Sequence, residues 1–197
     1  LPDDRTLGCL LNAGSTTTEL ITRLVQRLIA FHEAAAVVPN EPNYAGAAAE
    51  LAWWKREYGE AEGFIGSTWP PEHAAITNNF INTSLERNTK IIDRRLADGR
   101  VVEGHGDLRA AHIYLLDNTA QDIAIVDCIE FSEWFHFRYL DVGYDIAFLA
   151  MDLEALGYPD LADELAGRYC AATYDETFSV LQPLHRAFRA FVRGKVE

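Results

Sequence analysis

Cysteine is scarce in this chain, and its three copies stand far apart. Cys9, Cys128 and Cys170 form no CxxC pair and have no metal-ligand spacing, so the sequence predicts neither a disulfide framework nor a zinc ribbon. The chain also lacks an apolar run of the roughly eighteen residues that a membrane span needs. Its first residues show no basic-then-apolar secretion signal. We therefore expect a cytoplasmic protein in a reducing compartment.

Basic side chains are few beside the acidic ones. The chain has 17 Lys and Arg against 30 Asp and Glu, which gives a net charge of −13. Such a charge repels nucleic acid and anionic membrane surfaces, so we expect neither as a partner. It would attract a cationic small molecule, although many proteins are acidic only for solubility. With 197 residues the chain can bury a sizeable core, and we expect a single domain spanning 1–197.

Helical periodicity dominates the chain on both sides of a short β-rich section. From residue 15 to 98 apolar residues recur at helical spacing, and residues 101–127 change to a period of two over "VVE", "HIYLL" and "DIAIVD". Helical patterns return over 141–193, in stretches of about 141–156, 159–173 and 174–192. The sequence therefore predicts an α+β fold that is mainly helical and contains one short β-hairpin.

The predicted hairpin has an acidic residue at each side of its open end. The tripeptide "HGD" at residues 105–107 precedes the first strand, and Asp127 ends the second. If the strands pair around the turn-forming residues 117–121, Asp107 and Asp127 come to the same end of the hairpin. A Gly-Asp turn alone is common for backbone reasons, so the pairing of the two carboxylates carries the argument.

Two carboxylates in this arrangement suit phosphoryl transfer. One orients the attacking hydroxyl and accepts its proton, and the other holds a divalent metal ion on nucleotide phosphates. The protein-kinase pattern H-R-D-L-x-x-x-N matches this chain at His105, Asp107 and Leu108, with Asp127 at the distance expected for the metal-binding Asp. The Asn of that pattern is replaced by His112.

The motifs "HGD", "IAIVDCIEF" and "DVGYDIAFL" together resemble those of the aminoglycoside phosphotransferase family, in particular its poorly characterised bacterial subgroup. This family is the small-molecule branch of the protein-kinase-like fold. The segment "LVQRLIAFHEAA" resembles the family's first helix of the C-terminal lobe, so the likeness extends over most of the chain. It implies a kinase-like C-terminal lobe, with 1–14 as the end of the hinge, 15–98 helical, 101–127 as catalytic loop and hairpin, and 141–193 as C-terminal helices.

The resemblance implies roles for individual residues. Asp107 would be the catalytic base, Asp127 the magnesium ligand, and Asp141 with Asp145 the structural buttress of the loop. As a second metal ligand, His112 would suit manganese better than magnesium, because imidazole is a poor ligand for that hard ion.

Three neighbours of these residues have supporting roles. His105 is expected to brace the loop by hydrogen bonding. Arg109 would steady a phosphate or would simply be an exposed loop residue. Glu130, three residues after Asp127, would help to hold the metal or would bond the loop backbone.

The resemblance also implies ATP with magnesium or manganese as cofactor and a small hydroxyl compound, such as an aminoglycoside, as substrate. No Gly-rich loop and no VAIK-like lysine precede "LPDDRTL". We therefore expect that the N-terminal lobe is missing from this chain, and that the chain by itself binds nucleotide weakly and is inactive.

Two other function classes stay open. A pseudokinase or interaction domain is favoured by His112 and by the missing lobe. A metal-dependent hydrolase is the third option, because His105, Asp107, His112 and Asp127 mix ligand types that suit transition metals. Two features are interpreted as structural only: Cys128 as a small buried hydrophobe, and the basic end of the chain as a solvated helix face (Arg186, Arg189, Arg193 and Lys195).

Overall fold

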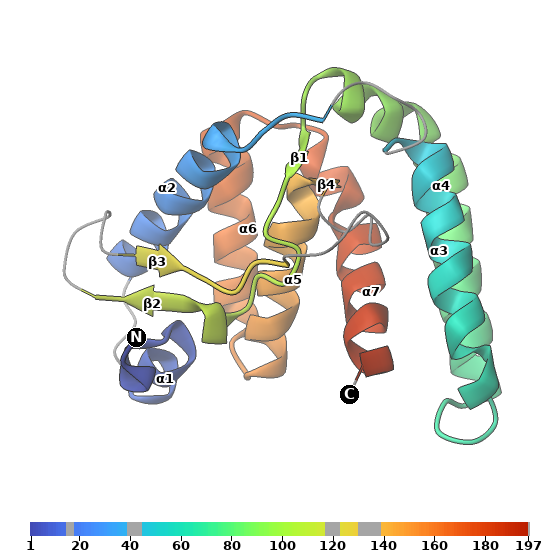
Figure 1. Ribbon diagram of the computed structural model, residues 1–197, viewed down its shortest axis with the longest axis horizontal. Coiled ribbons are helices and arrows are strands. Elements are labelled where there is room, and N and C mark those ends of the chain that lie inside the picture. Colours follow the sequence, from blue (N-terminus) through green and yellow to red (C-terminus); the bar gives the residue numbers. More distant parts are fainter. Residues whose placement is uncertain (15–17, 39–44, 117–122, 130–138, 197) are drawn as a thin grey trace.

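The computed structural model describes residues 1–14, 18–38, 45–116, 123–129 and 139–196. These residues form a mostly helical α+β structure with two small antiparallel sheets (Figure 1). The helices are α1 (Leu7–Asn12), α2 (Thr18–Ala34), α3 (Ala47–Ala61), α4 (Pro71–Ala97), α5 (Val142–Ala155), α6 (Pro159–Thr173) and α7 (Phe178–Val196), with 3-10 turns η1 (Asp3–Arg5), η2 (Glu62–Phe64) and η3 (Ala110–His112). The strands are β1 (Val101–Glu103), β2 (Ile113–Leu115), β3 (Ile123–Ile125) and β4 (Tyr139–Asp141).

Helix α5 forms the centre of the molecule and packs between α6 and α7 (Figure 1). Its sequence is apolar on nearly every side, and residues 142–150 are all buried, as expected of an interior helix. Asp141 caps the helix, because its Oδ1 accepts a hydrogen bond from the Gly143 N–H at 2.8 Å. The expected helix at 141–156 thus begins one residue later, and Asp141 ends strand β4 instead.

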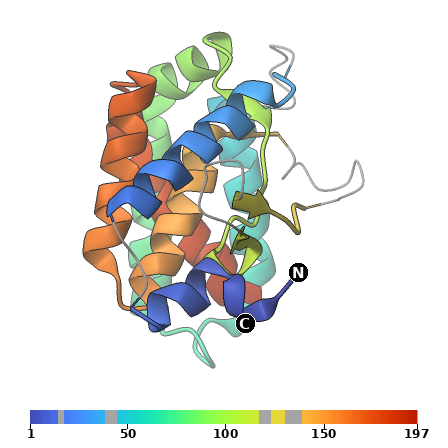
Figure 2. The same cartoon turned by 90° about the vertical axis from the view of Figure 1, so that its left-hand side faces the viewer.

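The apolar core has two main parts on opposite sides of α5. One part joins α1, α2, α6 and the β2–β3 hairpin to α5, and the other joins α3, α4 and α7 to it. Figures 1 and 2 show α3 and α4 side by side as a long helical hairpin, with both chain termini in the lower half of each view. Among the described residues, no helix combines the length and apolarity needed to cross a membrane.

The two sheets position the loop that carries the HGD motif. Strand β2 pairs with β3, with Ile113 opposite Ile125, which confirms the predicted hairpin; its expected turn at 117–121 lies outside the described residues. Strand β1 pairs with β4, with Val101 opposite Asp141, a pairing the sequence did not indicate. The chain between β1 and β2 therefore lies between the start of α5 and the hairpin.

The sequence pattern did not place the first helix of the chain or the start of the last one. Residues 1–14, expected as the end of a hinge, form η1 and α1, and the Arg5 Nε donates to the Leu115 carbonyl oxygen of β2 at 2.7 Å. Helix α7 begins at Phe178 and not at residue 174. The side chain of Asp175 accepts a hydrogen bond from the Phe178 N–H at 3.1 Å and so caps the start of the helix. Helix α6 has the predicted bounds.

Candidate functional site

The loop at residues 104–112 rests on the buried carboxylate of Asp145. The carboxylate accepts backbone hydrogen bonds from His105 at 2.7 Å and Gly106 at 2.8 Å, and His32 Nε2 lies 3.3 Å away. Burial alone would raise the pKa of Asp145, but the His32 contact and the two amide donors outweigh it and hold the pKa below its ordinary value. An ionised carboxylate therefore fixes the conformation of the loop, as expected for a buttress.

Close packing explains the two glycines that flank His105. A Cβ at Gly104 would lie 2.9 Å from Asp145 Oδ2. Gly106 has a φ of +78°, and a Cβ there would lie 2.9 Å from Ile129 Cδ1. Only glycine combines the positive φ with this approach, so the sequence "GHG" is dictated by backbone geometry.

His105 is neutral, with both of its ring nitrogens engaged. Its Nε2 donates to the Val126 carbonyl oxygen at 2.9 Å, and its Nδ1 accepts from the Asp107 N–H at 3.3 Å. Burial lowers the pKa of this ring despite the nearby carboxylates. The imidazole thus braces the loop against the hairpin, the role that the sequence predicts for it, and has no free nitrogen for proton transfer.

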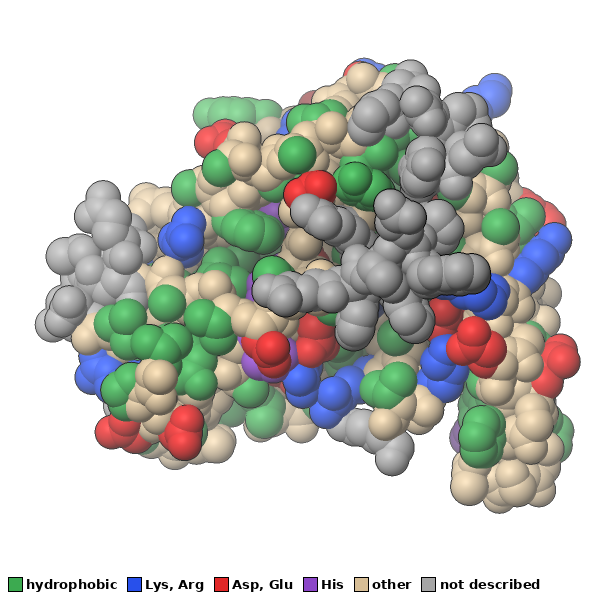
Figure 3. Space-filling view, in the orientation of Figure 1, with side chains coloured by type: hydrophobic (Ala, Val, Ile, Leu, Met, Phe, Trp, Pro, Cys, Tyr) green, Lys and Arg blue, Asp and Glu red, His purple; other side chains and the backbone are tan. Residues whose placement is uncertain are grey.

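His112 lies between Asp107 and Asp127. The His112 Nδ1 donates to the Asp107 carbonyl oxygen at 2.8 Å and lies 3.6 Å from Asp107 Oδ2, while its Nε2 lies 3.3 Å from Asp127 Oδ2. Arg109 donates to Asp107 Oδ2 through Nη2 at 3.0 Å and Nε at 3.2 Å. Figure 3 shows acidic, histidine and basic side chains gathered on this face, between the β2–β3 hairpin and α7.

Asp127 combines exposure with an unusual backbone. Its side chain is 77% exposed and its φ is +62°, in the left-handed region that Asp tolerates better than most residues. Such conformations cost about 1–3 kcal/mol and cluster at functional sites. The same turn carries Cys128 to the surface, so its expected burial is wrong: β3 ends at Ile125, and the chain leaves the sheet before residue 128.

The fit of a metal ion depends mainly on Asp127. Within the described residues, no group of three or more His, Cys, Asp or Glu side chains is arranged to hold a metal. Magnesium is commonly held by one or two carboxylates together with waters and substrate phosphates, and the exposed Asp127 fits that role. A metal at His112 Nε2 would have to displace Arg109, whose Nη2 lies 3.0 Å away. Glu130 lies outside the described residues.

The structure adds Asp152 to the residues that support the loop, and it shows that Asp141 has a different role. Asp152 Oδ2 accepts from the Ala110 N–H at 2.8 Å, a role that sequence reasoning missed. Its spacing of seven from Asp145 is two helical turns, which was the available signal. Asp141, assigned to the same buttress, instead accepts from Arg95 Nη2 at 2.8 Å and so joins α4 to the start of α5.

A cavity of about 310 Å³ opens beside Asp107. It is lined by the loop, by Phe148 of α5, by Glu57 of α3 and by basic residues of α7, but by neither His112 nor Asp127. The expectation of a solvated basic face on α7 is wrong for Arg189, which is 1% exposed. Arg189 follows His185 and Leu181 at intervals of four, so it falls on the buried stripe of the helix.

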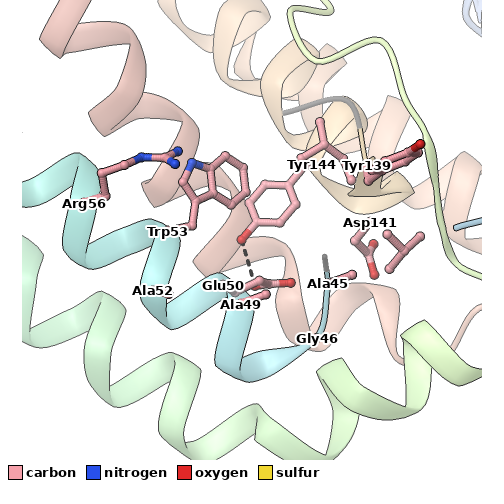
Figure 4. A pocket seen from close by; sticks show the side chains of 12 residues that line it. Ala45, Gly46, Ala49, Glu50, Ala52, Trp53, Arg56, Tyr139, Asp141 and Tyr144 are labelled. Atoms are coloured by element: carbon pink, nitrogen blue, oxygen red, sulfur yellow. Dashed lines mark hydrogen bonds between the residues drawn. The ribbon is translucent and has the colours of Figure 1, made fainter. Parts of the chain in front are cut away.

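A second cavity, of about 210 Å³, lies between α3, β4 and α5 (Figure 4). Glu50 on α3 faces Tyr144 on α5, whose hydroxyl donates to Glu50 Oε2 at 3.0 Å. Burial, with the charge of Asp141 nearby, raises the pKa of Glu50 to about 8. This carboxyl is therefore protonated at neutral pH.

The chain is similar to uncharacterised proteins from two strains of Mycobacterium tuberculosis and from Mycobacterium bovis. Each is 29% identical to it over 195 residues, an alignment that covers 99% of this chain and 38% of the relative. The chain thus spans about two fifths of the length of these curated relatives. No protein-family model and no solved structure matches it.

Proposed function

We propose that the protein transfers the γ-phosphoryl group of ATP to a hydroxyl of a small polar molecule, as a member of the kinase-like fold. One observation carries the proposal: Asp107 and Asp127 both lie beside His112 at one end of the β2–β3 hairpin, and a cavity lined by Asp107 does not include Asp127. An acceptor in the cavity and a metal-bound nucleotide at Asp127 would then approach each other at Asp107.

Asp107 would act on the acceptor. Its carboxylate orients the acceptor hydroxyl and accepts the proton while the hydroxyl oxygen forms a bond to the γ-phosphorus and the bond from that phosphorus to the ADP oxygen breaks. The products are a phosphate ester and ADP. Because Arg109 bonds Oδ2 of Asp107, we assign the proton-accepting role to Oδ1. When bound, magnesium with ATP supplies the phosphoryl group and neutralises its charge, and Asp127 would hold the metal.

A binding domain without turnover is the second candidate. It is favoured by His112, which replaces the Asn of the kinase pattern and whose two ring nitrogens already have partners in Asp107 and Arg109. The hydrolase reading has less support, because the described residues hold no cluster of three metal-binding side chains. Stoichiometric transition metal in the purified protein would favour the hydrolase.

The test is phosphoryl transfer by the full-length natural protein, followed by mass spectrometry. The protein is incubated with ATP, magnesium or manganese, and a pool of hydroxylated metabolites and aminoglycosides. We expect a phosphorylated product whose rate of formation falls about 100- to 10,000-fold in Asp107→Asn. Asp160→Asn, at an exposed position of α6, is the matched control and should keep the full rate.

Two outcomes would count against the transferase. Product formation at an unchanged rate in Asp107→Asn would remove Asp107 from the chemistry. No product with either metal, from protein whose circular dichroism is that of a folded chain, would favour the binding domain.

A further inference from the structure

Arg189 is a buried cation that forms no ion pair with a described residue. The residue is 1% exposed, and its Nε and Nη2 have no hydrogen-bond partner in the described part of the chain. Burial lowers the pKa of the guanidinium, but arginine remains charged at neutral pH. A buried charge that lacks a partner is unfavourable, so an arrangement of this kind indicates that a ligand completes it.

Three aromatic rings hold the guanidinium in place. Its central carbon lies 5.2 Å from the ring centre of Tyr144, 5.3 Å from that of Phe148 and 5.8 Å from that of Trp53. Aromatic faces attract the cation but accept no strong hydrogen bond from its N–H groups. The Nε and Nη2 donors are therefore held in place and are unpaired in the described part of the chain, an arrangement that suits an oxyanion bound in two-point geometry.

Arg189 and Asp107 line the same 310 Å³ cavity. Two further basic side chains of α7, Arg193 and Lys195, also line it, and Lys195 is neutralised by ion pairs to Glu57 and to Glu60, the latter at 2.7 Å. Arg189 is thus a buried cation of the cavity wall whose Nε and Nη2 are unpaired in the described part of the chain. The volume lies at the small end of the range for small-molecule pockets, so the occupant is a small molecule.

We propose that Arg189 binds an oxyanion of the acceptor, so that the substrate is a small hydroxylated carboxylate or phosphate ester whose hydroxyl reaches Asp107. This inference rests on the proposed phosphotransferase function and names its substrate class. It replaces the cationic acceptor that the net charge of −13 suggests, because the unpaired donors of a buried guanidinium in the cavity wall would bind an anion and repel a cation. The overall charge acts at long range, whereas the buried guanidinium acts at contact distance in a less screened environment.

The nucleotide is a less suitable occupant of this cavity. Its metal ligand would be Asp127, and neither Asp127 nor His112 lines the cavity. The acceptor and the nucleotide therefore use different sides of Asp107, as in-line transfer between two bound molecules requires.

The experiment is calorimetric titration of the full-length natural protein with matched anionic, neutral and cationic compounds. The panel pairs hydroxy acids and sugar phosphates with their neutral parents, with glucuronate and glucose 6-phosphate beside glucose, and glucosamine as the cation. We expect at least one anion to bind about 10- to 100-fold more tightly than its neutral parent, as for hydrogen bonds to charged groups. The preferred member distinguishes a carboxylate from a phosphate.

Arg189→Met should remove the preference for the anion. Arg189→Lys keeps the charge but loses the paired planar donors of the guanidinium, so it should retain part of the preference. Arg186→Met is the matched control, because Arg186 lies on the same helix and pairs with Glu154 and Asp163 away from the cavity. It should bind as the natural protein does. The thermal unfolding of each variant is measured beside the titration, and Arg189→Lys serves as the decisive variant if Arg189→Met does not fold.

Several results would overturn the inference. These are equal affinity for anionic and neutral compounds, tightest binding of glucosamine, an anion preference that survives in Arg189→Met, or a loss in Arg189→Met of ATP affinity alone. The same variants tested for transfer separate the two proposals. Anion binding that depends on Arg189 without phosphorylation supports the anion site and counts against the transferase. Phosphorylation of a neutral or cationic acceptor at unchanged kcat/KM in Arg189→Met supports the transferase and overturns the anion site.

Discussion

Arg95 and Arg189 are buried to the same degree, at 1% exposure each, but their surroundings differ completely. Arg95 donates five hydrogen bonds, to both carboxylate oxygens of Asp141, to both of Asp175 and to the Thr177 hydroxyl. Arg189 is surrounded by aromatic rings instead. Equal burial is therefore compatible with opposite roles.

The partners of a buried charge decide which role it has. The N–H groups of Arg95 are used within the protein, where they join α4 to β4 and to the turn before α7. Burial alone would lower the pKa of Arg95, but Asp141 and Asp175 outweigh it and raise the pKa. For Arg189, burial prevails and lowers the pKa. The first guanidinium belongs to the fold, and the second is left with capacity for a ligand.

The largest expected effect is that of Arg95→Met. It leaves the buried carboxylates of Asp141 and Asp175 without compensation, which costs about 3–5 kcal/mol in the free energy of unfolding. Urea unfolding followed by circular dichroism measures it. Arg94→Met is the matched control, because this neighbouring side chain is exposed and should change stability by less than about 0.5 kcal/mol. A loss of less than about 1 kcal/mol in Arg95→Met would contradict the structural role.

Asp145→Asn tests a satisfied buried charge of the opposite sign. His105 and Gly106 donate to different oxygens of this carboxylate, and Asn replaces one of them with an NH2 group that cannot accept, so we expect a loss of about 3 kcal/mol at pH 7. The pKa of Asp145 is lowered in the folded state, so its contribution is present at neutral pH and disappears as the pH falls through the folded pKa. The difference between the two proteins should therefore shrink in acid.

Asp152→Ala, which removes the acceptor, is the graded comparison for that variant. Asp152 accepts a backbone hydrogen bond from Ala110, so its loss should cost about 1 kcal/mol. Equal losses in the two variants would show that the loop does not depend specifically on Asp145.

Glu50→Gln examines a third way to bury an ionisable side chain, in which the carboxyl group is protonated and therefore neutral. The pKa of Glu50 is raised to about 8 in the folded state from an ordinary value of 4.5, so the native state binds the extra proton between these pH values. Stability of the natural protein should fall as the pH rises through that window. We expect the variant to be more stable by about 2–3 kcal/mol at pH 8 and equal to the natural protein at pH 4. Unfolding at the two pH values measures the effect, and a pH-independent difference would contradict it.

The smallest effect on stability is expected for Arg189→Met. The Nε and Nη2 of this buried charge have no hydrogen-bond partner among the described residues, so its replacement by an apolar side chain of similar length should leave the free energy of unfolding within about 1 kcal/mol or raise it. The same urea titration as for Arg95→Met makes the comparison direct. A loss as large as that of Arg95→Met would end the distinction between the two arginines.

Local pattern was sufficient for most of the secondary structure and for one pair of acids. The apolar spacing of α2 and α6 and the alternation of β2 and β3 depend on neighbours a few residues apart, so they can be recognised without tertiary contacts. Asp107 and Asp127 were found because a hairpin brings its two ends together. Cys128 was misplaced because the turn at Asp127 depends on a backbone angle that no local pattern indicates.

The sequence by itself determined the helical and hairpin elements and the acidic pair at the hairpin's open end. Only the tertiary structure decided which polar residues have partners: Asp141 faces Arg95, 46 positions earlier, and Arg189 meets Trp53 and shares a cavity with Asp107. The reason is physical. Periodicity depends on the local repeat of a helix or strand, whereas the pairing of a buried charge depends on which distant segments pack beside it.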